Sequence, residues 1–233
     1  KERQETVTYR DGFRTRDEKV TVLDTPFGPV VREDDANYYV LHSTALYDND
    51  QALGFLNLDM GRSLADFRAA LAQMLTPYNF AYADAQGNIA YFAAGMVPIR
   101  TYDANDAQVV DTPEKAAQYR WSFIKPEDMP AIVNPERGYI VTSNDPPALT
   151  AEGLPVFPGN YAAGFRNHRI SNLIENSTKG GAKLTHEGLA RIQCDVHSLF
   201  AEEMLPPLLP RLQAMSAQMS GQEQEALRIL AAW

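Results

Sequence analysis

One stretch of the sequence carries most of its structural and chemical signal: Asn134-Pro135-Glu136-Arg137-Gly138-Tyr139-Ile140-Val141-Thr142-Ser143-Asn144-Asp145-Pro146-Pro147. Turn-forming residues open it, and the β-branched and aromatic residues 139–142 predict a short strand. The two prolines end that strand because they lack a backbone donor. Asn144 is therefore expected at a strand exit, either as an amide that donates to developing negative charge or simply as a turn former before the prolines.

The flanking sequence predicts both strands and helices. Residues 5–31 and 38–41 indicate strands, with a hairpin turn at residues 10–12. A second hairpin is predicted from 78–84 and 89–92, whose nearly continuous apolar character indicates a sheet covered on both faces. Apolar residues at helical spacing predict helices over 63–75, from about 166, from about 185 to 204 and over 221–232. Ser63, followed three residues later by Asp66, is expected to begin the first of them with a cap that resembles a capping box. We expect Pro206, Pro207 and Pro210 to end the helix that begins near 185.

Composition narrows the functional classes. The chain has 233 residues, of which 45% are hydrophobic and 22% charged, values that are ordinary for a globular protein. Its net charge of −9 argues against nucleic-acid and anionic-membrane partners, since no basic stripe is available to neutralise phosphates. No apolar run approaches a membrane span, and because residues 1–20 are polar and charged we expect no signal peptide among them. Such a beginning predicts that residues 1–233 come from the middle of a longer protein.

Local patterns offer no complete catalytic centre. Cys194 and His197 lie three residues apart on a predicted helix face, but a buried structural cysteine is the expected state, and a catalytic pair is the less favoured alternative. The histidines and the single cysteine lack zinc-binding spacing. A nucleophile-elbow motif and a glycine-rich phosphate loop are both absent from the sequence.

Several ordered motifs lie between residues 82 and 170, within a resemblance that covers most of residues 20–210. They are Tyr82-Ala83-Asp84, Gly87-Asn88-Ile89-Ala90-Tyr91, Gly95 to Arg100, Trp121, Pro126, Asp128-Met129-Pro130, Asn134-Pro135, Gly138-Tyr139-Ile140, Ser143-Asn144-Asp145-Pro146-Pro147, Arg166 and Arg169-Ile170. With this set the chain resembles the penicillin acylase family (penicillin amidases), and in particular its cephalosporin (glutaryl) acylase branch.

The resemblance implies an α+β fold, part of the αββα sandwich of N-terminal nucleophile (Ntn) hydrolases, with mixed or antiparallel sheets and covering helices. It implies that residues 1–233 form a single domain, an internal fragment of the large (β) subunit. In that family autocleavage exposes a serine at the start of the large subunit, and its own α-amino group acts as the base. Residue 1 is Lys1, so the segment with the nucleophile is expected upstream of this chain.

The resemblance also implies site residues. Asn144 corresponds to the oxyanion-hole amide, and Arg166 to an arginine near the nucleophile that could hold Asn144 by hydrogen bonds; an ordinary salt bridge at a helix start is the alternative for Arg166. Tyr78 and Phe55 match acyl-pocket positions, with plain core packing as their alternative. The segment around Glu152 lacks the ligands of the family's calcium site. We therefore expect no metal and no cofactor.

The expected function is hydrolysis of linear amides of N-acyl compounds, such as β-lactam side chains or N-acyl homoserine lactones, through an N-terminal serine acyl-enzyme. The isolated chain is expected to be inactive. Its expected partners are the small-molecule substrate, the rest of its own precursor (small subunit and nucleophile segment) and, through an exposed strand edge, a second copy. By resemblance alone, a periplasmic or secreted location follows. The alternative is a binding or structural module that kept the acylase fold and lost catalysis.

Overall fold

The computed structural model describes residues 1–47, 50–99, 112–147 and 161–233. The described residues divide into two compact units. The first unit comprises the described residues of Lys1–Ile140 together with Pro147, and the second comprises Val141–Pro146 and the described residues of Asn160–Trp233. Throughout these ranges, none of the helices is both long and apolar enough to cross a membrane.

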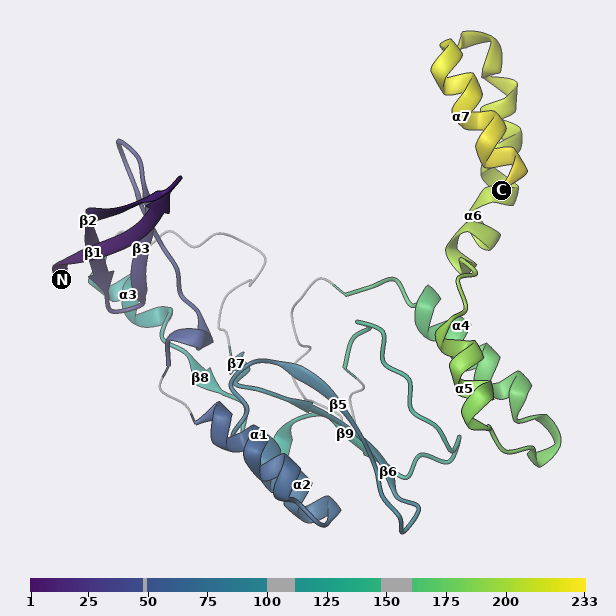
Figure 1. Ribbon diagram of the computed structural model, residues 1–233, viewed down its shortest axis with the longest axis horizontal. Helices are drawn as coiled ribbons and strands as arrows, with labels where there is room; N and C mark the ends of the chain where they lie inside the picture. The colour runs from purple at the N-terminus through teal and green to yellow at the C-terminus, as the bar shows by residue number, and fades with distance from the viewer. Residues whose placement is uncertain (48–49, 100–111, 148–160) are drawn as a thin grey trace. The chain divides into compact units, whose positions relative to one another are not determined.

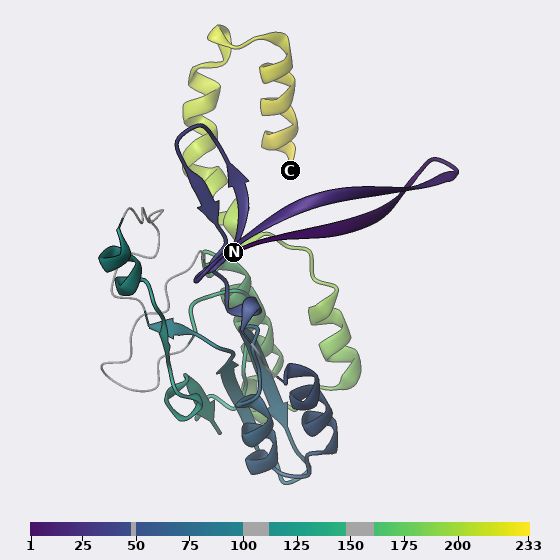
Figure 2. The same ribbon diagram turned by 90° about the vertical axis from the view of Figure 1, so that its left-hand side faces the viewer.

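The first unit begins with a four-stranded antiparallel sheet in the order β1-β2-β3-β4. Its strands are β1 (Glu2–Asp11), β2 (Arg14–Thr25), β3 (Gly28–Glu33) and β4 (Tyr38–Val40). β1 and β2 form a long twisted ribbon (Figure 2), paired continuously from Glu2 opposite Leu23 to Asp11 opposite Arg14. The predicted strands and their hairpin are confirmed, but its turn lies at Gly12 and Phe13 because β1 continues through Asp11.

A second antiparallel sheet, in the order β5-β6-β9, contains the core of the first unit (Figure 1). Its strands are β5 (Tyr78–Ala83), β6 (Ile89–Ala94) and β9 (Ala131–Val133). The predicted hairpin is confirmed as β5 and β6. Burial on both faces is confirmed only for the central strand β6, because β5 alternates between exposed and half-buried residues.

Side-chain alternation along β6 builds a core on each face of this sheet. Ala90, Phe92 and Ala94 join one buried cluster, while Tyr91 and Ala93 join another. The first cluster includes Leu71 and Met74 and packs against α2 (Leu64–Leu71) and α1 (Gln51–Met60); the second contains Met129, with Ile124, Ile132 and Ile140 packed against it. Ser63 caps α2, as predicted, by accepting a hydrogen bond of 3.1 Å from the amide of Asp66.

The remaining elements of the first unit are short. They are β7 (Pro98–Ile99), β8 (Ser122–Phe123), α3 (Pro113–Gln118) and the 3₁₀ turns Thr44–Leu46 and Pro126–Asp128. The strand predicted at residues 139–142 is absent, and that prediction was wrong. Side chains take the carbonyl groups that a ladder would need: Arg137 donates to the carbonyl of Tyr139, and Asn167 donates to that of Val141.

The second unit is helical. It contains α4 (Phe165–Ser177), α5 (His186–Gln193), α6 (Leu199–Ala214) and α7 (Gly221–Ala232), with 3₁₀ turns at Lys179–Gly181 and Ser216–Gln218. The helices predicted near 166 and over 221–232 are confirmed. The continuous helix predicted from 185 to 204 is wrong, because α5 ends at Gln193 and Ser198 caps a new helix, α6.

Two further expectations in this region are corrected. The three prolines do not end a helix but lie inside α6, which continues to Ala214 although their missing donors interrupt its hydrogen bonding. Cys194 is exposed rather than buried, since it lies just past the end of α5. His197 has left the helix and contacts Glu202 at 2.6 Å, so the shared helix face expected for Cys194 and His197 is also absent.

Candidate functional site

The loop that carries Asn144 has an unusual backbone that several hydrogen bonds hold. Asn144 has φ +62°, in the left-handed region that asparagine tolerates better than most residues. Its carbonyl accepts from the amide of Ala162 at 2.7 Å. Ser143 is buried, with 8% of its surface exposed, and its amide donates to Oδ1 of Asp145 at 2.8 Å. The loop around Asn144 is therefore fixed on both sides.

Arg166, in the first turn of α4, contacts this loop directly. Its Nη2 donates to the carbonyl of Ser143 at 2.7 Å and to Oδ1 of Asn144 at 2.9 Å. A guanidinium has donors and no acceptor, so the atom of Asn144 that faces it is the oxygen. The Nδ2 group of Asn144 is consequently turned away from Arg166, with its two N–H donors directed elsewhere. The structure thus brings together the two site residues predicted in this part of the sequence.

Two residues that the sequence analysis did not assign to the site also hold the loop. Asp145 accepts with Oδ2 from Nδ2 of Asn167 at 2.9 Å, in addition to the bond from Ser143. The same Nδ2 group donates to the carbonyl of Val141 at 3.4 Å. Asn167 follows Arg166 on α4, so the start of one helix binds the loop at consecutive positions. The only sequence signal for this pair was its position next to Asn144 and Arg166.

Helix α4 is itself anchored by an ion pair further along. Arg169 donates from Nε and Nη2 to both carboxylate oxygens of Asp195, at 2.9 and 2.8 Å. Such bidentate pairs add geometric specificity as well as energy. The hydrogen bonds from Arg169 lower the pKa of the Asp195 carboxyl group below its ordinary value. This contact fixes α4 relative to the segment between α5 and α6.

The two predicted acyl-pocket residues lie together in the first unit. The rings of Phe55, on α1, and Tyr78, at the start of β5, have centroids 6.2 Å apart and cross at 66°. Tyr78 also contacts Phe80 edge to face, at 5.8 Å. Phe55 is 42% exposed and Tyr78 43% exposed, so neither is an ordinary core residue. The pair presents an aromatic surface that suits apolar or aromatic groups.

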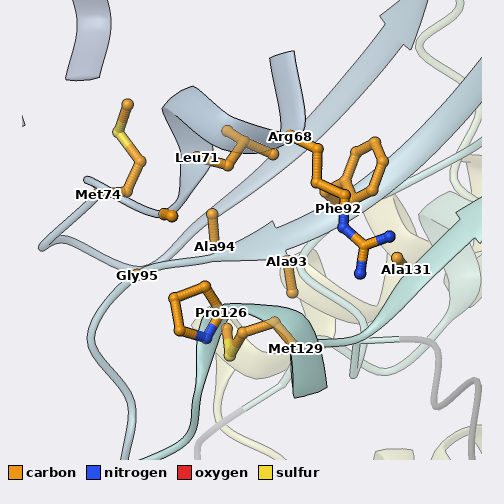
Figure 3. Close-up of a pocket in the computed structure, with 11 residues that line it drawn as sticks. Arg68, Leu71, Met74, Phe92, Ala93, Ala94, Gly95, Pro126, Met129 and Ala131 are labelled. Atoms are coloured by element: carbon orange, nitrogen blue, oxygen red, sulfur yellow. The ribbon is translucent and has the colours of Figure 1, made fainter. Parts of the chain in front are cut away.

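The first unit also contains a small cavity beside its core (Figure 3). Arg68 and Leu71 line it from α2, Phe92 and Ala94 from β6, and Met129 from the segment before β9. Its volume is about 30 Å³. That volume suits one or two water molecules and is too small for an acyl group. We therefore assign this cavity to packing rather than to substrate binding.

Histidine, cysteine and acidic side chains are the usual protein ligands of metal ions, and all of these types occur in the described part of the chain. No group of three or more histidine, cysteine or acidic residues is arranged there to hold a metal ion. Glu152, next to the position considered for a calcium ligand, lies outside the described residues.

The chain is similar to known penicillin G acylases. Penicillin G acylase from Escherichia coli is 24% identical over 181 residues, which make up 76% of this chain and 21% of that protein. A solved structure of a thermostable penicillin G acylase from Alcaligenes faecalis matches with a TM-score of 0.67 at 23% identity, and the match covers 100% of this chain and 41% of that one. This likeness confirms the α+β, Ntn-hydrolase type of fold. The chain spans about a fifth of the length of the Escherichia coli relative. Because the family model for penicillin amidase matches residues 1–233 in full, the chain belongs to the penicillin amidase family.

Proposed function

We propose that the protein containing residues 1–233 hydrolyses linear amides of N-acyl compounds, with Asn144 as a donor to the oxyanion of the tetrahedral intermediate. The observation that carries this proposal is the hydrogen bond from Arg166 to Oδ1 of Asn144. It fixes the side-chain amide with its Nδ2 donors available to an incoming oxygen. Membership of the penicillin amidase family supports the same chemistry.

In the proposed reaction a serine at the N-terminus of the mature large subunit attacks the amide carbonyl carbon. The α-amino group of that serine takes its proton and passes it to the leaving amine as the C–N bond breaks. Negative charge develops on the carbonyl oxygen, and Nδ2 of Asn144 donates to it. Water then attacks the acyl-enzyme and releases the acid. The serine and the rest of the precursor lie outside residues 1–233 in this proposal, so this chain alone is inactive.

The aromatic pair Phe55 and Tyr78 supports a substrate with an apolar or aromatic acyl group. The side-chain amides of β-lactams and the amides of N-acyl homoserine lactones both fit this description. A periplasmic or secreted location completes the proposal. Cell fractionation with an antibody against these residues would test the location directly.

The proposal is tested with the full-length protein and with residues 1–233 alone, on phenylacetyl, glutaryl and long-acyl chromogenic amides. We expect turnover only by the full-length protein. Asn144→Ala should lower kcat by about 10²–10³-fold, the usual cost of losing one oxyanion donor. Exposed Asn172, on α4, provides the matched control, because Asn172→Ala removes an amide from the same helical unit without touching the loop.

Each result has a clear meaning. Hydrolysis by residues 1–233 alone would show that the nucleophile is internal and that this mechanism is wrong. If neither protein hydrolyses any amide, the alternative of a non-catalytic binding module replaces the proposed function. The acyl group that is cleaved fastest would identify the substrate class.

A further inference from the structure

Asp145 and Asn167 together hold the backbone that presents Asn144, and we propose that they are positioning residues for the reaction. The inference rests on the proposed function of Asn144 and adds two residues to it. Neither side chain has to touch the substrate. Their role is to keep the Asn144 amide in place while charge develops on the substrate oxygen.

The contacts form a closed connection between the loop and helix α4. One carboxylate oxygen of Asp145 accepts from the amide of Ser143 at 2.8 Å, and the other accepts from Nδ2 of Asn167 at 2.9 Å. Nδ2 of Asn167 also donates to the carbonyl of Val141 at 3.4 Å. Both oxygens of Asp145 and both donors of the Asn167 amide can therefore be used on this loop.

This connection is more than a local turn. The bond from Ser143 to Asp145 spans two residues and could form in any short turn of this kind. The bond from Asn167 spans 22 residues and comes from the helix that also carries Arg166. Arg166 thus holds the side chain of Asn144 while Asn167 holds the backbone beside it. Two consecutive residues of α4 thus hold different parts of the same loop.

The left-handed conformation of Asn144 explains why such support is needed. A residue other than glycine has a higher free energy in the left-handed backbone region than in the common regions. Such a conformation, as at Asn144, persists when several surrounding contacts hold it. Without the bond to Asn167, the loop could relax toward an ordinary conformation and swing the Asn144 amide away. A displacement of about 1 Å at a reacting group can cost about 10²-fold in rate.

The test is an exchange of donor and acceptor in the full-length protein. Asn167→Asp places a second carboxylate against Asp145, and we expect kcat to fall by about 10- to 100-fold while KM stays within about threefold. The double variant Asp145→Asn with Asn167→Asp restores a hydrogen bond of reversed direction. A carboxylate at 167 cannot donate to the carbonyl of Val141, so that bond of 3.4 Å stays lost. We therefore expect a partial recovery, with kcat of the double variant at least about threefold above that of Asn167→Asp.

The matched control is Asn172→Asp, which makes the same change from amide to carboxylate at an exposed position of α4. It should leave kcat within about twofold of the wild type. The proposal is overturned if Asn167→Asp leaves kcat unchanged, or if the double variant fails to recover activity. Should Asn167→Asp not fold, Asn167→Ala removes the donor without adding charge, and an unchanged kcat in that variant overturns the proposal equally.

Failure of the proposed function can be told apart from failure of this inference. If the wild-type protein hydrolyses none of the amides, the proposed function falls, and a crystal structure of Asn167→Ala then decides the positioning question. A relaxed backbone at Asn144 in that structure supports the positioning role of Asn167. A left-handed Asn144 identical to that of the wild type overturns it.

Discussion

At the scale of single residues, the guanidinium of Arg166 determines which end of the Asn144 amide is turned away from it, and the proposed function assigns that end to the substrate. One nitrogen serves two acceptors, the carbonyl of Ser143 and Oδ1 of Asn144. An ammonium group could reach one of these oxygens, but its flexible stem does not impose the planar geometry of arginine. The identity of residue 166 should therefore affect the rate of the reaction more than its charge does.

We predict that Arg166→Lys in the full-length protein lowers kcat by about tenfold or more, through loss of one of two charge-assisted hydrogen bonds. Steady-state kinetics on the best amide of the panel measures this effect. Arg191→Lys, on the exposed surface of α5, is a control with the same chemical change. Equal activity of the two variants would show that the charge at 166 is sufficient and that its geometry is not needed.

At the scale of elements, β6 depends on a sharp exit at Gly95. This residue has φ +127°, and an added Cβ would lie 2.6 Å from the Cα of Pro77. Both the conformation and the close approach of the backbone of Pro77 require glycine. Gly87, in the β5–β6 turn, also has a positive φ of +89°, but an added Cβ there meets nothing within 4 Å.

These two glycines give a matched pair of substitutions. Gly87→Ala should destabilise the fold by about 1–2 kcal/mol, from backbone strain alone. Gly95→Ala should cost about 2–4 kcal/mol, because a steric clash with a neighbouring backbone is added to the strain. Urea denaturation of residues 1–233, followed by circular dichroism, compares the two. Equal costs would contradict the role assigned to the contact with Pro77.

At the scale of the whole molecule, the two units are stabilised in different ways. The first unit has buried clusters on both faces of β6, including Phe92 at 4% exposed. In the second unit, the described helices bury no side chain fully. The ion pair between Arg169 and Asp195 is accordingly a larger share of the contacts that stabilise the second unit than any described ion pair is in the first unit. A covering surface from the rest of the precursor would supply the missing burial, in line with the proposed partner.

This difference predicts a dependence on pH in the second unit. Because its pKa is lowered in the folded state, Asp195 contributes its stabilisation fully above the ordinary carboxyl pKa of about 4 and loses it as the pH falls through the lowered value. Asp195→Asn should therefore reduce stability at pH 7 and have a smaller effect near about pH 3. Amide hydrogen exchange of α4 in both proteins measures this. An effect of the same size at both pH values would contradict the prediction.

The sequence was most informative where structure is local. The turn at residues 84–88, the cap at Ser63 and the start of α4 near Arg166 depend on neighbours in the chain, and all were predicted. The prediction for residues 139–142 failed because side chains take two of their carbonyls, and one of these side chains, Asn167, lies 26 residues from its acceptor Val141. The break between α5 and α6 was also missed. At that break Asp195 pairs with Arg169, which lies 26 residues earlier in the chain. The helical spacing of apolar residues gives no information about such a distant contact.

The candidate site shows the same limit. Asn144 and Arg166 came from resemblance to a family rather than from any local pattern, and their contact is present. Their catalytic roles remain predictions. Asp145 and Asn167 were not assigned roles, because a bond between residues 22 positions apart leaves no signal in a single sequence. Phe55 and Tyr78 were expected at acyl-pocket positions, and that role remains a prediction; their mutual contact and their exposure were not foreseen from the sequence.

The left-handed backbone of Asn144 has a consequence for how this protein can evolve. That backbone favours Gly, Asn, Asp and His, while the proposed chemistry requires a side-chain donor, and only asparagine and histidine meet both demands. Among the single-nucleotide neighbours of asparagine (Asp, Ser, Thr, Lys, His, Tyr and Ile), only histidine does so, and its ring places the donor elsewhere. Position 144 therefore has few short mutational routes to a working substitute. Mutant libraries designed to change the acyl specificity should therefore keep Asn144 and vary Phe55 and Tyr78.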